Sequence, residues 1–177
     1  MTIRFDDKVA IVTGAGGGIG KQHALELAKR GAKVVVNDLG GSVDGSGASD
    51  AAEEVVDLIK SDGGEAISNG ASVTDINAVK NMVQQTMEEW GRIDILVNNA
   101  GILRDKSFHK VTLEDFELVM DVHFQGTLNC THSVFPIMRE QEYGRIIFTS
   151  SSSGVFGNFG QTNYGSAKMA MIGLMNT

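Results

Sequence analysis

The sequence predicts an α/β fold, a Rossmann-type doubly wound parallel sheet with helices on both faces. Short apolar segments rich in β-branched residues alternate with longer segments whose apolar residues recur with the period of about 3.6 that one helix face requires. The short segments are apolar throughout, as in parallel strands that are covered on both sides. A glycine cluster directly after the first of them is typical of this fold class, for which we expect the strand order 3-2-1-4-5.

The first expected strand–helix–strand unit occupies residues 8–37. Residues 8–13 form a mainly apolar run that is followed by glycine, as in a buried strand. Residues 18–29 carry alanines and leucines on one helical face, and Gly31 is placed to cap that helix. Residues 33–37 contain three consecutive valines and are the second buried strand.

The middle of the chain repeats this alternation. Residues 50–60 are expected to form a helix with valines and an isoleucine on one face, and residues 65–68 a third, weak strand. Asp75 is a suitable N-cap for a helix that runs to about Trp90. Residues 93–97 are the fourth expected strand.

The last part of the chain contains one more strand between two helices. Thr112 begins a longer helix whose first turn holds two acidic residues, where the helix dipole favours them. We expect Pro136 to bend or end that helix. Residues 145–149 are the fifth strand, and a further helix begins near Asn163 and continues to the end of the sequence.

The composition excludes several classes of protein. The chain has 177 residues, the length of one domain, and its net charge of −7 argues against a nucleic-acid-binding surface. A single cysteine, Cys130, excludes an intramolecular disulfide framework and a cysteine-cluster metal site. No apolar run approaches the roughly 20 residues that span a membrane, and the N-terminus has no signal-peptide pattern. We therefore expect no nucleic acid, no membrane and no metal, and a cytosolic type of compartment.

The glycine cluster is the first candidate binding site. Gly14, Gly18 and Gly20, with Ile19 between the last two, lie where the first strand passes into the first helix. Glycine lets the backbone turn tightly and approach a pyrophosphate closely, and the helix N-terminus offers free N–H groups to it. The sequence therefore predicts a dinucleotide phosphate site at this loop.

Asp38 is the second candidate binding residue. It ends the second expected strand, 18 residues after Gly20. A carboxylate at this place accepts both hydroxyls of an adenosine ribose, and it repels the 2′-phosphate of NADP. Because Leu39 follows it and the glycine loop contains no Arg or Lys, we predict NAD rather than NADP as the cofactor.

Chemically useful side chains follow two further strands. Two asparagines begin residues 98–101, after the fourth strand, and serines fill residues 150–153, after the fifth. Tyr164 and Lys168 are four residues apart and so share one face of the last helix. A free phenol ionises only near pH ~10, and a nearby ammonium favours its phenolate form. This arrangement suits proton transfer coupled to hydride transfer to a nicotinamide.

Together these motifs resemble the short-chain dehydrogenase/reductase family. The resemblance implies that Tyr164 is the general acid and base, and that Lys168 binds the nicotinamide ribose and stabilises the phenolate. Ser151, 13 residues before the tyrosine, is implied to position the substrate oxygen. Asn99 would bind the cofactor beside the glycine loop.

Three longer stretches, residues 37–41, 98–105 and 144–161, look like one group within the family. That group contains the (3R)-hydroxyacyl-CoA dehydrogenase unit of peroxisomal multifunctional enzymes of type 2 and its bacterial relatives. The resemblance implies oxidation of a (3R)-3-hydroxyacyl-CoA to the 3-oxoacyl-CoA in fatty-acid oxidation, with Ser72 and Val73 flanking the adenine. It also implies a homodimer or homotetramer, in the cytoplasm of a bacterium or in the peroxisome of a eukaryote.

One position departs from the usual family pattern. His123 stands where most members carry an asparagine of a proton relay, and we interpret it as a helix residue that acts through its backbone. The group with the hydroxyacyl-CoA dehydrogenases resembles this chain at the same position.

Members of the family continue past the tyrosine helix with two further strands and a substrate loop. We therefore interpret residues 1–177 as a single NAD-binding domain truncated within the catalytic helix. If the protein ends at Thr177, we expect weak NAD binding at best and no turnover. Two alternatives remain open: a 3-oxoacyl-thioester reductase of fatty-acid synthesis, and a catalytically inert nucleotide-binding fragment.

Overall fold

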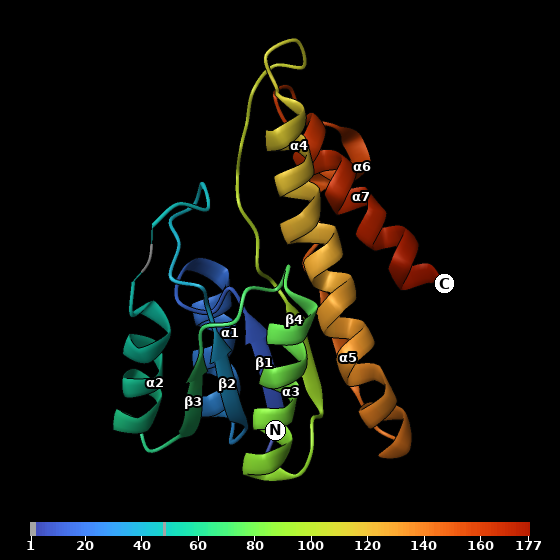
Figure 1. The fold of residues 1–177 in the computed structure, drawn as a ribbon. Helices are drawn as coiled ribbons and strands as arrows, with labels where there is room; N and C mark the ends of the chain where they lie inside the picture. Colours follow the sequence, from blue (N-terminus) through green and yellow to red (C-terminus); the bar gives the residue numbers. More distant parts are fainter. Residues whose placement is uncertain (1–2, 48) are drawn as a thin grey trace.

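A single parallel sheet forms the centre of the molecule. The computed structural model describes residues 3–47 and 49–177. Its strands have the spatial order β3-β2-β1-β4-β5, and neighbouring strands are parallel throughout (Figure 1). The predicted fold class and strand order are confirmed. The strands are β1 (Val9–Thr13), β2 (Lys33–Asn37), β3 (Glu65–Asn69), β4 (Ile95–Asn98) and β5 (Arg145–Phe148).

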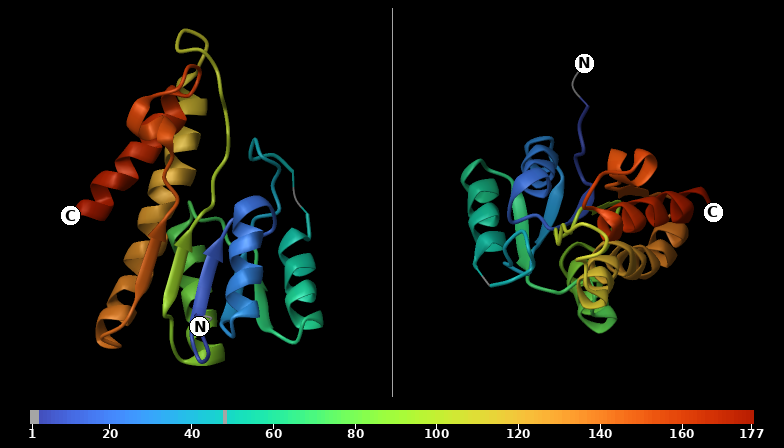
Figure 2. Two further views of the ribbon diagram at one scale, coloured as in Figure 1. Left: turned by 180° about the vertical axis from the view of Figure 1, so that it is seen from behind. Right: turned by 90° about the horizontal axis from the view of Figure 1, so that it is seen from above.

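Helices cover both faces of this sheet, α1 and α2 on one side and α3 and α5 on the other (Figure 2). A π-helical turn, η1 (Asp121–Gln125), joins α4 to α5 in one continuous rod, and α7 packs beside its upper half (Figure 1). The helices are α1 (Gly18–Lys29), α2 (Ala51–Ser61), α3 (Ile76–Trp90), α4 (Leu113–Met120), α5 (Gly126–Glu140), α6 (Ser152–Phe156) and α7 (Thr162–Asn176).

The core has two layers because the side chains of each strand alternate between the two faces. Ala10 and Val12 of β1 pack with α1 and α2, whereas Ile11 packs with α3 and α5, and all three are fully buried. Burying one Val or Ile side chain contributes about 1.5–3 kcal/mol. The continuous apolar character of β1, β2 and β4 follows from this double cover.

Two expected helix caps are confirmed and one is displaced by a residue. The Asp75 carboxylate accepts from the amides of Asn77 and Ala78, and the Thr112 hydroxyl accepts from Asp115 N–H at 3.1 Å. Arg30 is the C-cap of α1, and Gly31 is the next residue, with φ +99°.

The sequence predicts that Pro136 bends or ends its helix, but the helix does not end there. Pro136 lies inside α5, which continues to Glu140. Proline removes the N–H that would bond to the carbonyl of His132. Both residues are solvent-exposed, so water can reach that carbonyl and the helix can continue.

The fourth strand is shorter at its start than expected. The backbone N–H of Ile93 donates to the Gln141 side chain at 3.0 Å, and its carbonyl accepts from the same side chain at 2.7 Å. These bonds to a side chain take the place of ladder bonds at Ile93, which lies outside the strand, and β4 begins at Ile95.

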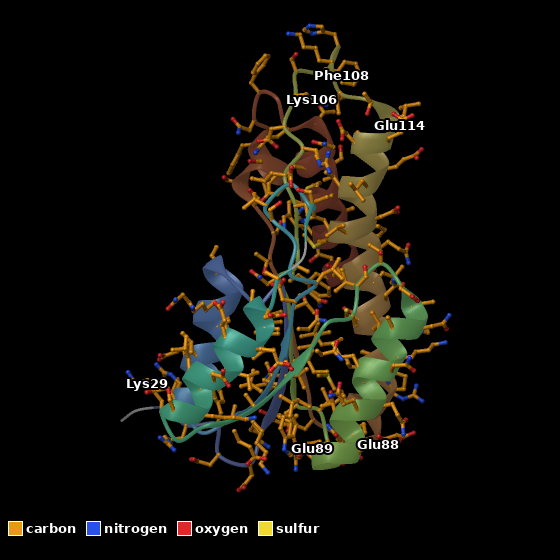
Figure 3. The ribbon with its side chains drawn as sticks, turned by 60° about the vertical axis from the view of Figure 1, so that its left-hand side comes forward. Lys29, Glu88, Glu89, Lys106, Phe108 and Glu114 are labelled. Atoms are coloured by element: carbon orange, nitrogen blue, oxygen red, sulfur yellow. The ribbon has the colours of Figure 1, made fainter. Side chains whose placement is uncertain are left out.

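The strands end at one edge, where the residues of the expected site lie. Figure 3 places Lys106 and Phe108 at the upper end of the molecule and Lys29, Glu88 and Glu89 at the lower end, where the strands begin. The loops that leave β1, β2, β4 and β5 all start at the upper, carboxyl edge, as parallel pairing requires.

A buried carboxylate braces the opposite, amino edge. Asp94 accepts from the amide of Val9 at 3.0 Å and from Arg92 at 2.6 and 2.7 Å, and Lys8 Nζ lies 3.7 Å away. Burial opposes its ionisation. The hydrogen bonds from Arg92 and Val9 and the charges of Arg92 and Lys8 outweigh burial and hold the pKa of the Asp94 carboxyl below its usual value.

Replacing Asp94 with Ala is expected to lower the free energy of unfolding by about 3 kcal/mol at neutral pH, because two cations and an amide lose their partner. The lowered pKa means that this contribution is fully present above the unfolded-state pKa of about 3.9. It is lost as pH falls through the still lower folded-state pKa. Urea unfolding from pH 7 downward measures it, with the exposed Asp57→Ala as control. Equal losses for the two variants at pH 7 would contradict the prediction.

Candidate functional site

The glycine loop between β1 and α1 is a close-packed turn. Gly14 has φ +63° and Gly18 has φ +52°, in the left-handed region that favours glycine. A Cβ on Gly20 would collide with the carbonyl oxygen of Gly14 and with Asn99 Nδ2. In contrast, Gly17, Gly18 and Ile19 are exposed, so the N-terminus of α1 is open to a ligand. The loop thus has the backbone and the accessible helix end that a pyrophosphate site requires.

Asp38 lies beside this loop, directly after β2. Its Oδ2 accepts from the amide of Gly16 at 2.8 Å, and its Oδ1 accepts from the amide of Gly40 at 2.7 Å. A Cβ on Gly16 would lie 2.9 Å from the Asp38 carboxyl carbon, so only glycine allows this approach. The carboxylate is therefore fixed at the edge of the glycine loop.

Asn99 ties the glycine loop to the end of β4. Its Nδ2 donates to the carbonyls of Thr13 and Gly14, each at 3.1 Å. Thr13 Oγ1 accepts from the amides of Asn99 and Ala100, each at 3.1 Å. The structure thus places Asn99 beside the loop, where the family resemblance puts it.

Ser72 and Val73 follow β3 at the same edge, but they differ in exposure. The Val73 side chain is 7% exposed and packs in the core against Gly126, while its carbonyl accepts from Asn129 Nδ2 at 2.9 Å. Ser72 is half-buried and bonds to the Thr74 hydroxyl. Any contact of Val73 with an adenine would therefore be made by its backbone.

Lys168 is buried against the end of β5. Its Nζ donates to the carbonyl of Thr149 at 2.6 Å and lies 5.4 Å from the centre of the Tyr164 ring. Only 3% of the lysine is exposed, and burial lowers its pKa to about 8. Most of its ammonium remains charged at neutral pH, in surroundings where that charge acts more strongly than in water.

Ser151 lies on the segment that packs against the same helix. It is the N-cap of α6, and its Oγ accepts from the amide of Ser153 at 3.2 Å. The adjacent Ser150 donates to the carbonyl of Lys168 at 2.9 Å. A Cβ on Gly154 would be 2.9 Å from the amide nitrogen of Met169, which shows how closely α6 approaches α7. The three residues of the expected catalytic set thus lie on two segments in contact.

Asn163 is a site residue that the sequence analysis missed. It is 1% exposed; its Nδ2 donates to the carbonyl of Arg104 at 3.1 Å, and its Oδ1 accepts from the amide of Tyr164 at 2.8 Å. It therefore anchors the start of α7 to the segment after β4. The only sign of this residue in the sequence is an asparagine directly before Tyr164. An asparagine at that position does not reveal whether its side chain is buried or exposed.

The side chain of His123 makes contacts that a role through the backbone alone does not require. Its imidazole is 3% exposed, and Nε2 lies 3.1 Å from the nitrogen and 2.8 Å from the oxygen of Ile102. The ring meets the Tyr164 ring edge-on, at 5.2 Å between centres and 89° between planes. Burial, and then the nearby charge of Lys168, lowers the pKa of His123 to about 4, so the ring is neutral at physiological pH.

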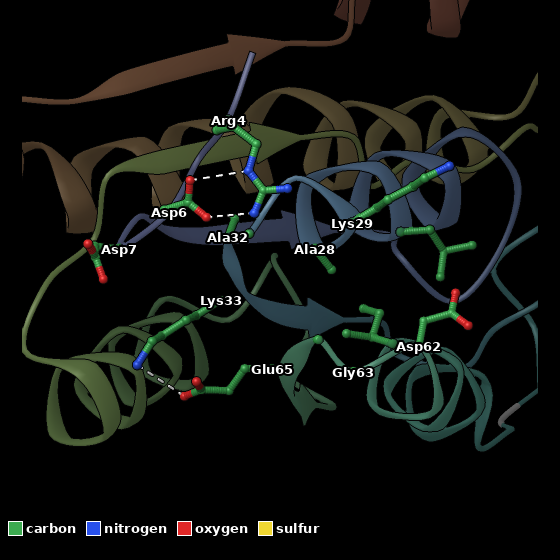
Figure 4. A pocket seen from close by; sticks show the side chains of 14 residues that line it. Arg4, Asp6, Asp7, Ala28, Lys29, Ala32, Lys33, Asp62, Gly63 and Glu65 are labelled. Atoms are coloured by element: carbon green, nitrogen blue, oxygen red, sulfur yellow. Dashed lines mark hydrogen bonds and ion pairs between the residues drawn. The ribbon is translucent and has the colours of Figure 1, made fainter. Parts of the chain in front are cut away.

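A cavity of about 410 Å³ lies at the other end of the molecule, away from these residues (Figure 4). Arg4 pairs with Asp6 and Lys33 with Glu65 at its wall. It is bounded by the starts of the strands and the ends of α1 and α2, so it shares no residue with the carboxyl-edge site.

Within residues 3–47 and 49–177, no group of three or more His, Cys, Asp or Glu is arranged to hold a metal ion. None of the helices in the described part of the chain is both long and apolar enough to cross a bilayer.

Known proteins match nearly the whole chain. The sequence pattern of the family described as short chain dehydrogenase matches residues 8–177. The chain is 56% identical over 176 residues to the peroxisomal multifunctional enzyme type 2 of Drosophila melanogaster, and 57% identical over 178 residues to the peroxisomal multifunctional enzyme A of Dictyostelium discoideum. These alignments cover 99% and 100% of this chain but 29% and 40% of the two relatives, so the chain spans less than half of their length.

Two further similarities concern a reductase and a solved structure. A 3-oxoacyl-(acyl-carrier-protein) reductase of Synechocystis sp. is 44% identical over 170 residues, which are 96% of this chain and 66% of that protein. The structure of a 7α-hydroxysteroid dehydrogenase complexed with NADH and 7-oxo glycochenodeoxycholic acid superposes with a TM-score of 0.87 at 34% identity. That superposition covers 97% of this chain and 64% of the other.

Gly20→Ala is expected to lower the free energy of unfolding by about 2 kcal/mol, because the added methyl collides with backbone that cannot move independently. Gly17→Ala is the matched control, since nothing lies within 4 Å of its Cβ position and its φ is −154°. The control should change stability by less than about 0.5 kcal/mol. Thermal and urea unfolding of both variants measure the difference; equal stabilities would show that the loop is not packed as described.

Proposed function

The chain belongs to the short-chain dehydrogenase/reductase family, and on that basis we propose that it is an NAD-dependent oxidoreductase that interconverts a secondary alcohol and a ketone. The substrate that we propose is a (3R)-3-hydroxyacyl-CoA, oxidised to the 3-oxoacyl-CoA in fatty-acid oxidation. The observation that carries the proposal is the buried Lys168 ammonium, held by Thr149 at 5.4 Å from the Tyr164 ring at the carboxyl edge of the sheet.

Tyr164 is the proposed base for the alcohol. Its phenolate oxygen takes the proton of the substrate hydroxyl as the carbonyl forms. Lys168 stabilises that phenolate through its positive charge, which is only weakly screened because the side chain is buried. The Ser151 hydroxyl orients the substrate oxygen toward the tyrosine. In the reduction direction the same tyrosine returns the proton.

The residues at the carboxyl edge fit a bound dinucleotide. The Gly14–Gly20 loop and the open end of α1 would hold the pyrophosphate, and the fixed Asp38 carboxylate would accept the adenosine ribose hydroxyls. Asn99, Ser72 and the Val73 backbone would line the same edge, and Lys168 would also bind the nicotinamide ribose. Bound NAD would supply the hydride acceptor that the protein itself lacks.

The proposal of a hydroxyacyl-CoA substrate is based on the resemblance of the three longer stretches and on the two multifunctional relatives, which are named as peroxisomal enzymes. The chain corresponds to less than half of either relative, so the reaction proposed is that of this unit only. By the same reasoning the protein would act in the peroxisome of a eukaryote or the cytoplasm of a bacterium, as a homodimer or homotetramer.

The similarity to a 3-oxoacyl-(acyl-carrier-protein) reductase favours a second candidate, reduction of a 3-oxoacyl thioester in fatty-acid synthesis. Asp38 argues against it, because a carboxylate beside the adenosine ribose repels the phosphate of NADPH, the usual cofactor of biosynthetic reduction. An inert nucleotide-binding unit is the third candidate, and it predicts NAD binding without turnover.

Tyr164→Phe is expected to lower kcat for a (3R)-3-hydroxyacyl-CoA by about 10³-fold, because the proton acceptor is lost. The Kd for NAD, measured by calorimetry, should change less than about threefold, a change worth well under 1 kcal/mol. Tyr143→Phe is the control: this second tyrosine packs between Lys8 and Arg145, away from the site. Turnover that survives in Tyr164→Phe would refute the mechanism, and NAD binding without wild-type turnover would support the inert alternative.

Calorimetric titration is expected to show NAD bound about tenfold or more tightly than NADP, a difference of about 1.4 kcal/mol. Asp38→Asn should narrow that difference, because it removes the negative charge while keeping one oxygen for a backbone N–H. Asp50→Asn, at the exposed N-cap of α2, is the control and should leave the preference unchanged. A wild-type preference for NADP would overturn the cofactor assignment and favour the reductase.

A further inference from the structure

The imidazole of His123 is in contact with three parts of the site at once. It projects from the π-turn η1, and a Cβ on Gly101 would collide with its Cε1. Its Nε2 reaches the backbone of Ile102, and its ring meets Tyr164 edge-on. Gly101 thus leaves the space in which the ring lies.

The shorter of the two distances to Ile102 favours one tautomer. Nε2 lies within hydrogen-bond distance of a donor and an acceptor of the same residue, the N–H at 3.1 Å and the carbonyl oxygen at 2.8 Å. An unprotonated Nε2 would direct its lone pair at that carbonyl oxygen and leave a buried Nδ1–H without an acceptor. A protonated Nε2 donates the shorter bond, to the carbonyl oxygen, and leaves the Ile102 N–H without this acceptor. Nδ1 is then an unprotonated atom, and it has no hydrogen-bond partner among the described residues. We take the 2.8 Å contact with the carbonyl oxygen as the deciding one.

Ile102 connects this hydrogen bond to the tyrosine. Its side chain is 8% exposed and packs in a small cluster with Val119 and Ala167, against which Tyr164 also packs. The same stretch of backbone is held two residues further along by Asn163, whose Nδ2 donates to the carbonyl of Arg104. His123 therefore contacts Tyr164 directly through its ring and indirectly through Ile102.

We propose that His123 is a positioning residue for Tyr164: its neutral imidazole, protonated on Nε2, ties Ile102 to the π-turn and holds the tyrosine ring in one orientation. The inference rests on the proposed function of Tyr164 as the base. It differs from a proton-relay role because the histidine neither gains nor loses a proton during the reaction. Lys168, on α7, is the charged group that acts on the ring, and its positive charge opposes protonation of the imidazole.

The tautomer is tested without any assay of activity. Long-range nitrogen–proton NMR of the chain labelled with ¹⁵N-histidine should show a His123 signal from a neutral ring protonated on Nε2 at pH 7. That signal should disappear in His123→Gln, which assigns it, and in the wild type it should change only as pH approaches about 4. An Nδ1–H tautomer or an imidazolium at pH 7 would overturn the proposal.

Two variants separate positioning from space filling. Phenylalanine keeps a ring of similar size but cannot bond to Ile102, whereas glutamine places an amide N–H as many bonds from Cα as Nε2. We expect His123→Phe to lower kcat about tenfold while KM and the Kd for NAD stay within about threefold, and His123→Gln to recover kcat to within about threefold of wild type. Unchanged kcat in His123→Phe, or equal losses in both variants, would contradict the proposal.

The same variants give an answer if the wild-type chain has no turnover, an outcome that would count against the proposed function alone. Nuclear Overhauser contacts between the Tyr164 ring and the Ile102 methyl groups, observed in a Tyr143→Phe background, should be strong with His123, lost in His123→Phe and retained in His123→Gln. Contacts of equal strength with His123 and with Phe would show that the imidazole only fills space.

Discussion

The parallel pairing of β1 with β2 and β4 is the constraint on which the site depends. Residues 9–13 pair in register with β2, and residues 10–12 pair with β4. Because all three strands run in the same direction, they deliver Thr13, Asp38 and Asn99 to one edge. The hydrogen bonds among the glycine loop, Asp38 and Asn99 then fix that edge as a single surface. Without parallel pairing these residues would lie at opposite ends of the sheet.

The proposed catalytic residues add a second, helical layer to this edge. Lys168 reaches back to the end of β5 through its bond to Thr149, and Ser150 bonds to the carbonyl of Lys168. These bonds fix α7 to the sheet, while Asn163 and His123 fix the segment after β4 to α7 and to η1. The position of Tyr164 is thus determined by backbone contacts from three elements, and the energetic cost of burying Lys168 is met partly by its short hydrogen bond.

The fold, and the segments that carry the candidate site, could be predicted from sequence because their signals are local. Consecutive valines, a glycine cluster and the capping residues Asp75 and Thr112 each identify an element within a few positions. The roles of Tyr164, Lys168 and Ser151 came from resemblance, and the contacts of their segments agree with it. The side-chain contacts of His123 and Asn163 could not be predicted in this way, because their partners lie 21 and 59 positions away in the sequence. The π-turn and the continuation of α5 past Pro136 likewise depend on packing and solvent exposure rather than on local preference.

A crystal structure of the chain with NAD would test the central claim, that the carboxyl edge is one assembled dinucleotide and proton-transfer site, most directly. The account predicts the pyrophosphate at the Gly14–Gly20 loop, the adenosine ribose hydroxyls on the Asp38 carboxylate, and the nicotinamide ribose at Tyr164 and Lys168. A dinucleotide bound in the cavity at the amino edge, beside Arg4 and Lys33, would contradict it, as would a nicotinamide ribose that does not contact Lys168.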